Sequence, residues 1–180
     1  HVSIHAGVGA GIILDHHLYT GLAGTAGEAG HMIVQPGGRS CPCCNHGCLE
    51  QYISEPAVLS RYRELSGRTT VSIDDLVWAY NQKETAALAV TDEFTTYLAC
   101  GINNLWNLFS PECIILNSQL TAYLPQLLPE ILQKLSPRFR ATCQLKLSTL
   151  QDTGVLLGAA KVCISKYLGT EKLYFSGLQP

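Results

Sequence analysis

A histidine and four cysteines that fall close together constrain the fold of this chain more than any other feature. Residues 31–48 contain His31 and the segment Cys-Pro-Cys-Cys-Asn-His-Gly-Cys. Three thiolates and an imidazole that reach one ion make a structural zinc site. Asn45 and Gly47 are turn-forming residues, which allow the last cysteine to return to the Cys-x-Cys pair. We therefore predict that zinc is bound by four side chains: His31, Cys41, Cys43 and Cys48.

Disulfide bonds are the alternative use of these cysteines, but Cys41 and Cys43 are too close in sequence to pair with each other comfortably. Cys44 has two interpretations: it replaces Cys43 as a metal ligand, or it is a free thiol. The remaining cysteines lie in apolar segments that are typical of buried helices or strands: Cys100, Cys113, Cys143 and Cys163. This usage indicates reduced thiols and a cytoplasmic protein, in which clustered cysteine and histidine residues more often bind metal.

The composition excludes several classes of protein. The chain has 180 residues, of which 47% are hydrophobic and 14% are charged, and its formal net charge is −2. These values are typical of an ordered globular domain and not of a disordered chain. There is no basic patch of the kind that binds nucleic acid, and the longest apolar runs are too short to span a membrane. Because the first residues already alternate like a strand, we expect the chain to be part of a longer protein.

Hydrophobic periodicity predicts an alternation of strands and helices. Strands are predicted at 2–6, 12–14, 18–20, 113–116 and 143–147, and a weaker one at 31–34. Helices are predicted at 55–66, 73–80, 84–109, 124–135 and 155–168, with capping residues at several of their ends. The glycines within 7–11 are expected to form a tight hairpin turn, where the backbone either approaches a phosphate or simply reverses. This order predicts an α/β fold with a partly parallel sheet.

Four motifs together resemble the signature of the ROK family, which contains bacterial sugar kinases and sugar-responsive transcriptional repressors. They are Gly7-x-Gly9-x-Gly11, Gly27-Glu-x-Gly-His31, Cys-x-Cys-x4-Cys and Gly47-Cys-Leu-Glu50. The resemblance continues through residues 107–111 and covers most of the chain, as the second half of a family member. It implies the ribonuclease H-like, actin-like ATPase fold, with residues 1–180 as a C-terminal sugar-sensing and dimerisation lobe. A DNA-binding domain and a first lobe would then lie outside the chain.

The resemblance also implies roles for individual residues. It implies the same four zinc ligands, and contacts to sugar hydroxyl groups from Glu28, His31 and Glu50. Carboxylates accept hydrogen bonds from hydroxyls, and a metal that fixes the imidazole leaves its second nitrogen facing a ligand. Gly7 and Gly9 would be the remnant of a loop that binds nucleotide phosphate. From the residues alone, Glu28 and Glu50 also fit solvated carboxylates, with Glu50 in the first turn of a helix.

Three departures from the family pattern bear on the choice between regulator and enzyme. Ala6 stands where kinase members carry a phosphate-binding threonine, and Asn117-Ser118 replaces a Gly-Gly pair beside the nucleotide. The catalytic aspartate of the kinases belongs to the first lobe. Cys44 replaces a glycine, and a positive φ there would cost cysteine on the order of 1 kcal/mol. Ala6, Asn117-Ser118 and the place of the catalytic aspartate in the first lobe all favour a regulator.

We therefore expect the effector-binding and dimerisation half of a sugar-responsive repressor. The alternative is the second lobe of a sugar kinase that phosphorylates a hexose or N-acetylhexosamine with ATP, and a third interpretation is a zinc-stabilised fragment without a ligand. The expected partners are a sugar or sugar phosphate, a second copy of the chain, DNA through the missing N-terminal domain, and a sugar-transport protein. Dimerisation is expected because several aromatic residues lie on helices: Trp78, Tyr97, Trp106 and Phe109.

Overall fold

The computed structural model describes residues 1–150 and 153–169. The chain divides into two compact units, His1–Ser148 and Thr149–Pro180. The second unit contains the helix α8 (Thr153–Leu168), which was predicted from residue 155 onward. The first unit contains the strands and the other described helices, so the predicted α/β class is confirmed.

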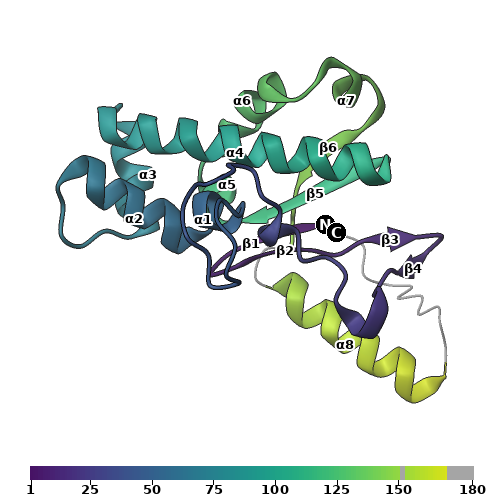
Figure 1. Ribbon diagram of the computed structural model, residues 1–180. Helices are drawn as coiled ribbons and strands as arrows, with labels where there is room; N and C mark the ends of the chain where they lie inside the picture. The colour runs from purple at the N-terminus through teal and green to yellow at the C-terminus, as the bar shows by residue number, and fades with distance from the viewer. Residues whose placement is uncertain (151–152, 170–180) are drawn as a thin grey trace. The chain divides into compact units, whose positions relative to one another are not determined.

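Four short strands form the central sheet of the first unit (Figure 1). They are β1 (Val2–Ile4), β2 (Val8–Ala10), β5 (Cys113–Ser118) and β6 (Gln144–Leu147), in the spatial order β2-β1-β5-β6. β1 pairs with β2 antiparallel, whereas β5 pairs in parallel with both β1 and β6. The predicted partly parallel sheet is therefore confirmed. A separate hairpin is formed by β3 (Ile13–Leu14) and β4 (His17–Leu18).

The long helix α4 (Thr85–Phe109) organises the other helices of the first unit. It packs against four of them: α1 (Glu50–Ile53), α2 (Glu55–Ser66), α3 (Ile73–Asn81) and α6 (Leu127–Lys134). Its buried residues Phe94, Leu98 and Ile102 belong to the same core as Ile4 of β1 and Leu116 of β5. Full burial of such a side chain contributes about 1.5–3 kcal/mol, so this helix is the main scaffold under the sheet.

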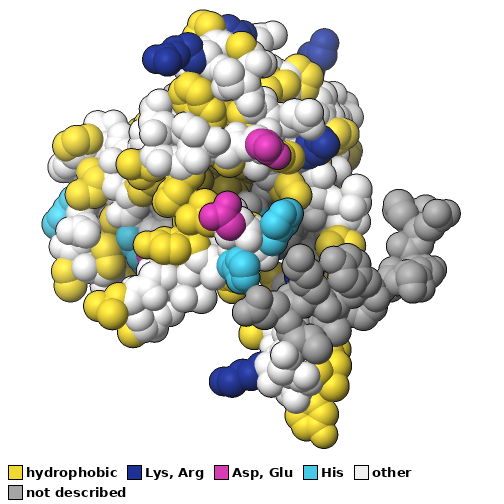
Figure 2. All heavy atoms as spheres, turned by 90° about the vertical axis from the view of Figure 1, so that its right-hand side faces the viewer, with side chains coloured by type: hydrophobic (Ala, Val, Ile, Leu, Met, Phe, Trp, Pro, Cys, Tyr) yellow, Lys and Arg dark blue, Asp and Glu magenta, His cyan; other side chains and the backbone are white. Residues whose placement is uncertain are grey.

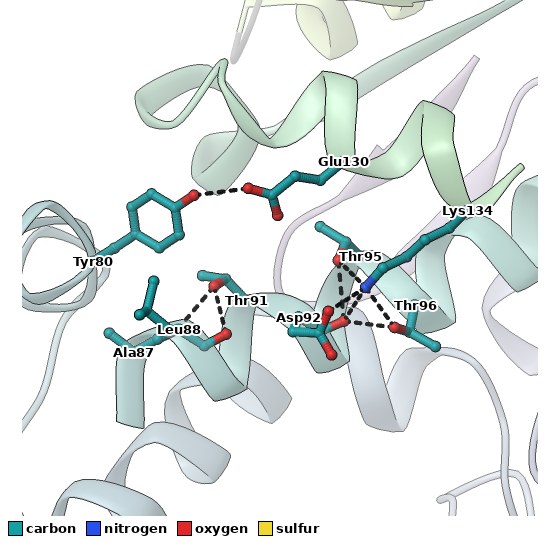
Figure 3. A network of polar contacts seen from close by, with 9 residues as sticks. All are labelled: Tyr80, Ala87, Leu88, Thr91, Asp92, Thr95, Thr96, Glu130 and Lys134. Atoms are coloured by element: carbon teal, nitrogen blue, oxygen red, sulfur yellow. Dashed lines mark hydrogen bonds and ion pairs between the residues drawn. The ribbon is translucent and has the colours of Figure 1, made fainter. Parts of the chain in front are cut away.

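A lysine joins α6 to α4 through several acceptors (Figure 3). Lys134 Nζ donates to the Asp92 carbonyl at 2.9 Å, to Thr95 Oγ1 at 2.8 Å and to Thr96 Oγ1 at 2.7 Å, and it pairs with the Asp92 carboxylate. These contacts fix the position of α6 along α4.

The capping residues predicted for α2 and α3 are present. Ser54 Oγ accepts a hydrogen bond from the Ala57 N–H, and Gly67 ends α2 in the left-handed conformation. Ser72 and Asp75 form a reciprocal capping box at the start of α3. Each cap satisfies backbone groups that have no partner within the helix.

Two predictions for the N-terminal segment are wrong. Val8–Ala10 is the edge strand β2 and Gly9 lies opposite Ser3, so the turn between the strands is confined to residues 5–7. Glycines weaken a strand without preventing it, and here pairing with β1 decides the conformation. The strand predicted at 31–34 is absent, because Ala29–His31 forms a 3-10 turn and Ile33 makes only one bridge, to Cys48. The strand predicted at 18–20 is observed as β4, one residue earlier.

The helix predicted at 124–135 is confirmed as α6, although it begins three residues later, and the helix α5 (Gln119–Tyr123) before it was not predicted. α5 ends before Leu124, and α6 begins at Leu127. Pro125 disfavours helical geometry at the residue before it, and Leu124 has the non-helical φ and ψ of −121° and 68°. The short helices α1 and α7 (Pro137–Thr142) were not predicted, since a helix of one or two turns carries little periodicity.

Two of the aromatic residues singled out in the sequence are used inside the first unit. Tyr97 stacks on Tyr52, with ring centroids 4.1 Å apart, and Trp106 packs edge-on against Phe139 at 6.0 Å. Trp78, in contrast, has 57% of its surface exposed. Among the described residues, no helix is long and apolar enough to cross a bilayer.

An exposed apolar face lies where the end of α4 meets the N-terminal strands. It is formed by exposed residues of three elements: Ile13, Leu14, Phe109 and Ile115. A hollow of about 270 Å³ lies within it and extends to the start of β1. Figure 2 views the molecule from the side of α4's C-terminal end and shows hydrophobic side chains gathered there beside acidic and histidine side chains. Exposed apolar surface of this kind is typical of a face that another molecule or segment covers.

Candidate functional site

The loop between β4 and α1 brings the four predicted metal ligands into one cluster. Their ligand atoms all lie within 4.8 Å of one another, and they belong to His31, Cys41, Cys43 and Cys48. The backbone closes the loop, since the Cys41 N–H donates to the Asn45 carbonyl at 2.9 Å and the Cys44 N–H donates to the Cys41 carbonyl at 3.0 Å. Side chains that are up to seventeen positions apart in the sequence therefore surround one possible metal position.

Two of the distances in this cluster match tetrahedral coordination. His31 Nδ1 lies 3.6 Å from Cys41 Sγ, and Cys43 Sγ lies 3.6 Å from Cys48 Sγ. Bonds of about 2.3 Å to sulfur and about 2.0–2.1 Å to nitrogen place the ligand atoms of a tetrahedral site roughly 3.5–3.8 Å apart. Three sulfur atoms and one imidazole nitrogen are also a donor set that suits zinc.

The thiols of Cys43 and Cys48 differ in electrostatic environment. A backbone hydrogen bond from Asn45 is the main cause that lowers the pKa of Cys43 to about 7. Burial raises the pKa of Cys48 to about 12. Without a metal, the Cys48 thiol therefore keeps its proton at neutral pH, and a metal ion must displace that proton to bind. Metal affinity should consequently fall as the pH is lowered.

Gly47 and Cys44 both have left-handed backbone conformations, but only one of them is glycine. At Gly47 φ is +83°, and an added Cβ would lie 1.7 Å from the Gln35 carbonyl oxygen, so no other residue fits. At Cys44 φ is +70°, as the departure from the family pattern implied. Its thiol is exposed, and its Sγ lies 4.0 Å from the Pro42 carbonyl oxygen. The structure therefore places Cys43, and not Cys44, in the cluster.

Replacing Cys44 with glycine is expected to raise the free energy of unfolding by about 1 kcal/mol, because glycine adopts a positive φ without steric cost. Denaturant unfolding of the metal-loaded protein measures this change. Cys43→Gly is the matched control and should lose a ligand and become less stable. Loss of bound metal from Cys44→Gly would show that the wrong cysteine has been placed in the cluster.

Glu50 meets the glycine segment directly. Its Oε2 accepts a hydrogen bond of 2.9 Å from the Val8 N–H, at the start of β2. Glu50 is the first residue of α1 and lies two residues after Cys48, so the metal loop sets the position of this carboxylate. Gly7 lies in the adjacent turn, and a Cβ atom added to it would lie 3.1 Å from Glu50 Oε2.

The segment that contains Glu28 and His31 packs along the free edge of β2, the edge from which the Val8 N–H donates to Glu50. The Ala10 N–H donates to the Gly27 carbonyl at 2.7 Å, and an added Cβ on Gly30 would lie 2.4 Å from the Val8 carbonyl oxygen. With Nδ1 facing the cysteines, His31 Nε2 lies 3.8 Å from Glu28 Oε2. Glu50 and the segment of Glu28 and His31 thus both lie beside the free edge of β2.

Arg39 is a positioning residue that the sequence did not reveal. Its guanidinium pairs with Glu93 of α4 at 2.6 Å, donates to the Gln51 carbonyl at 2.7 Å and lies 4.6 Å from the centre of the Tyr52 ring. Gln51 Nε2 in turn donates to Cys41 Sγ at 3.6 Å. These contacts tie the metal loop to α4, and no local signal predicts a pairing across 54 positions.

His5 and Glu55 form a second group that sequence reasoning missed. His5 Nδ1 lies 3.4 Å from Glu55 Oε1, and His5 Nε2 lies 3.4 Å from Asn117 Nδ2. The Glu55 N–H also donates to the His5 carbonyl at 2.9 Å. The group lies at the carboxyl ends of β1 and β5, adjoining the turn that leads to Val8. In α/β sheets this edge is where ligands bind.

Comparison with known proteins identifies the family. The model of the ROK family matches residues 1–166. The chain belongs to the ROK family. Among curated ROK relatives, it is 32% identical over 177 residues to the xylose repressor of Bacillus spizizenii, a match that covers 96% of this chain and 46% of the relative. It is 33% identical over 138 residues to the N-acetylglucosamine repressor of Escherichia coli O157:H7, covering 72% of this chain and 34% of the relative.

Solved ROK structures have the same fold. A ROK transcriptional regulator described as a homologue of the E. coli MLC protein aligns with a TM-score of 0.76 and 30% identity, over 94% of this chain and 46% of that one. A ROK glucokinase from Streptomyces griseus aligns with a TM-score of 0.76 at 23% identity, over 89% and 58% of the two chains, and this likeness concerns the fold alone. The α/β sheet is thus that of the ROK proteins, which have the actin-like ATPase fold. The chain spans about half the length of the curated relatives that it matches.

Proposed function

We propose that this chain is the effector-binding half of a sugar-responsive transcriptional regulator. The observation that carries the proposal is that relatives named xylose repressor match nearly the whole chain at 31–32% identity. The location of Glu28, His31 and Glu50 beside one edge of β2 supports it, because side chains there can pair with several hydroxyl groups of one small ligand.

Within this proposal, zinc has a structural role. His31, Cys41, Cys43 and Cys48 would hold the ion, which contributes folding free energy and fixes the imidazole through Nδ1. The Nε2 of His31 then donates or accepts a hydrogen bond at a sugar hydroxyl, while Glu28 and Glu50 accept hydrogen bonds from neighbouring hydroxyls. Since Glu50 already accepts the Val8 N–H through Oε2, its other oxygen is the one that receives the ligand.

A gel-shift titration of the full-length regulator tests the proposal. DNA from its own promoter should be bound through the N-terminal domain and released when D-xylose, D-glucose or N-acetyl-D-glucosamine is added. Release that persists in a Glu50→Gln variant at the same sugar concentration would count against the site, and DNA binding that no sugar changes would count against the function.

We further propose that the chain acts as a homodimer in the cytoplasm, mainly through its helices. Trp78 and the exposed apolar face, which includes Phe109, provide surface for a second copy, and symmetric regulators read two half-sites. A docking sugar-transport protein remains a further proposed partner. Analytical ultracentrifugation should give one discrete dimeric species. A monomer over a wide concentration range would contradict the dimer, and polydispersity would indicate that the apolar face belongs against another part of the protein.

The kinase alternative predicts activity that we do not expect. Ala6 offers no hydroxyl to a phosphate, Asn117 and Ser118 are buried side chains where kinases have glycine, and the Val8 N–H is already donated to Glu50. Because phosphoryl transfer depends on positioned donors, we expect no sugar-dependent ADP release in a coupled assay with ATP and magnesium. Turnover above the buffer background that Glu50→Ala abolishes would establish the kinase instead.

A further inference from the structure

We propose that His5 is a positioning residue, which anchors the turn between β1 and β2 to the start of α2 and so keeps the Val8 N–H on the Glu50 carboxylate. The proposal is carried by three contacts of His5, made by its carbonyl group and by the two nitrogen atoms of its ring. The effect on the turn does not depend on a ligand, whereas an effect on sugar affinity rests on the function proposed above.

The turn has few other means of being held in place. It is closed by the His5 N–H, which donates to the Gly7 carbonyl at 2.9 Å. Ala6 and Gly7 are exposed and carry no polar side chain, whereas His5 is half-buried. The side chain of His5 is therefore the part of this turn that can make polar contacts with the rest of the protein.

His5 meets the first residue of α2 twice. The Glu55 N–H donates to the His5 carbonyl at 2.9 Å, and His5 Nδ1 lies 3.4 Å from Glu55 Oε1. That carboxylate oxygen is buried and has no hydrogen-bond partner in the part of the chain that the structure describes. A buried acceptor without a donor is costly, so the imidazole beside it is held there as the donor within reach.

Asn117 sets the orientation of the imidazole ring. It lies in β5 with only 3% of its surface exposed, and its Nδ2 lies 3.4 Å from His5 Nε2. An amide nitrogen can only donate, so Nε2 accepts and the proton of the neutral ring is carried by Nδ1. We assign this tautomer from the partners of the two nitrogens, and it directs the Nδ1–H at the Glu55 carboxylate.

The two anchors of the turn lie close together in the chain. Glu50 and Glu55 begin the consecutive helices α1 and α2, and the turn is attached to the first through Val8 and to the second through His5. Only two small residues separate His5 from Val8, so a shift of one attachment moves the other. His5 thereby fixes which oxygen of Glu50 the backbone occupies and which remains for a ligand.

Two substitutions of His5 separate the contacts of its ring. The amide nitrogen of asparagine takes roughly the place of Nδ1, and the amide group of glutamine reaches roughly the place of Nε2. In the zinc-loaded chain without sugar, His5→Gln should speed hydrogen exchange of the Val8 N–H about five- to tenfold, because the contact with Glu55 is lost. His5→Asn keeps that contact and should leave the rate nearly unchanged. NMR measures both rates.

The same spectra contain the controls. The Leu98 N–H lies in the middle of α4, where exchange requires global unfolding, so His5→Gln should change its rate less than that of Val8. His16→Gln removes an exposed imidazole from the turn between β3 and β4 and should leave Val8 unaffected. Equal acceleration at Val8 and Leu98 in His5→Gln would reveal general destabilisation and would overturn the positioning role.

The remaining outcomes separate this inference from the proposed function. Faster Val8 exchange in His5→Asn but not in His5→Gln would make Asn117 the anchor and overturn the inference, as would no change in either variant. Calorimetric titration with the sugar that binds the unaltered chain should show about five- to tenfold weaker binding to His5→Gln and nearly full affinity in His5→Asn. Failure of D-xylose, D-glucose and N-acetyl-D-glucosamine to bind the unaltered chain would contradict the proposed function, while the exchange rates would still decide the role of His5.

Discussion

Replacing Cys48 with serine should abolish metal binding and destabilise the loop that carries the site. Cys48 is fully buried, its Sγ lies 3.6 Å from Cys43 Sγ, and its backbone forms the bridge to Ile33. A structural zinc site contributes its binding free energy to folding, so loss of one thiolate ligand should lower the free energy of unfolding by several kcal/mol. Elemental analysis and denaturant unfolding of protein purified without added zinc measure both effects.

Cys44→Ser is the matched control for this experiment, because it removes an adjacent thiol that lies outside the cluster. It should retain one zinc per chain and nearly the stability of the unaltered protein. A metal stoichiometry near zero in the folded, unaltered chain would refute the metal site. Equal metal loss in both variants would show that the cluster is assembled differently.

Replacing Glu50 with glutamine should weaken sugar binding about 10- to 100-fold while preserving the fold. A hydrogen bond to a charged group contributes about 1.5–3 kcal/mol, and glutamine can still accept the Val8 N–H through its amide oxygen. The β1–β2 hairpin should therefore remain in place while the negative charge that attracts hydroxyl donors is lost. Calorimetric titration with the sugar that binds the unaltered chain measures the change.

Glu64→Gln serves as the control, since Glu64 lies on α2 and pairs with Arg61. Its sugar affinity should be unchanged. Glu50→Gln protein that binds sugar with unaltered affinity, and shows an unaltered circular dichroism spectrum, would remove Glu50 from the proposed site.

The elements of the fold that could be predicted are those whose signal is local. The periodicity of α4 extends over 25 residues, and the Ser72–Asp75 capping box lies within four, so both were found. β2 was missed because its three residues include a glycine and its conformation depends on pairing with β1. The helix α5 was missed because it has only five residues and directly follows β5, so it carries little periodicity.

The candidate site also contains residues that could be predicted from the sequence and residues that could not. The four clustered ligands were predictable because their residue types and spacing are dictated by tetrahedral coordination. The role of Arg39 was not, since its partner Glu93 lies 54 positions away and the contact exists only after the loop has packed on α4. The His5–Glu55 pair was also hidden, because it arises from the ends of β1 and the start of α2 meeting at the carboxyl edge of the sheet. The left-handed backbone at Cys44 was predictable only from the family pattern, not from cysteine itself.

Hydrogen exchange of the zinc-loaded chain, with and without saturating sugar, tests the proposed site most directly. D-xylose, D-glucose and N-acetyl-D-glucosamine are added in turn, and protection is mapped along the chain. The result that we predict is that one of these sugars slows exchange at residues 5–8, 28–31 and 48–51 together. Protection by none of them, or protection confined to the exposed apolar face around Ile13 and Phe109, would contradict a sugar site organised by the metal loop.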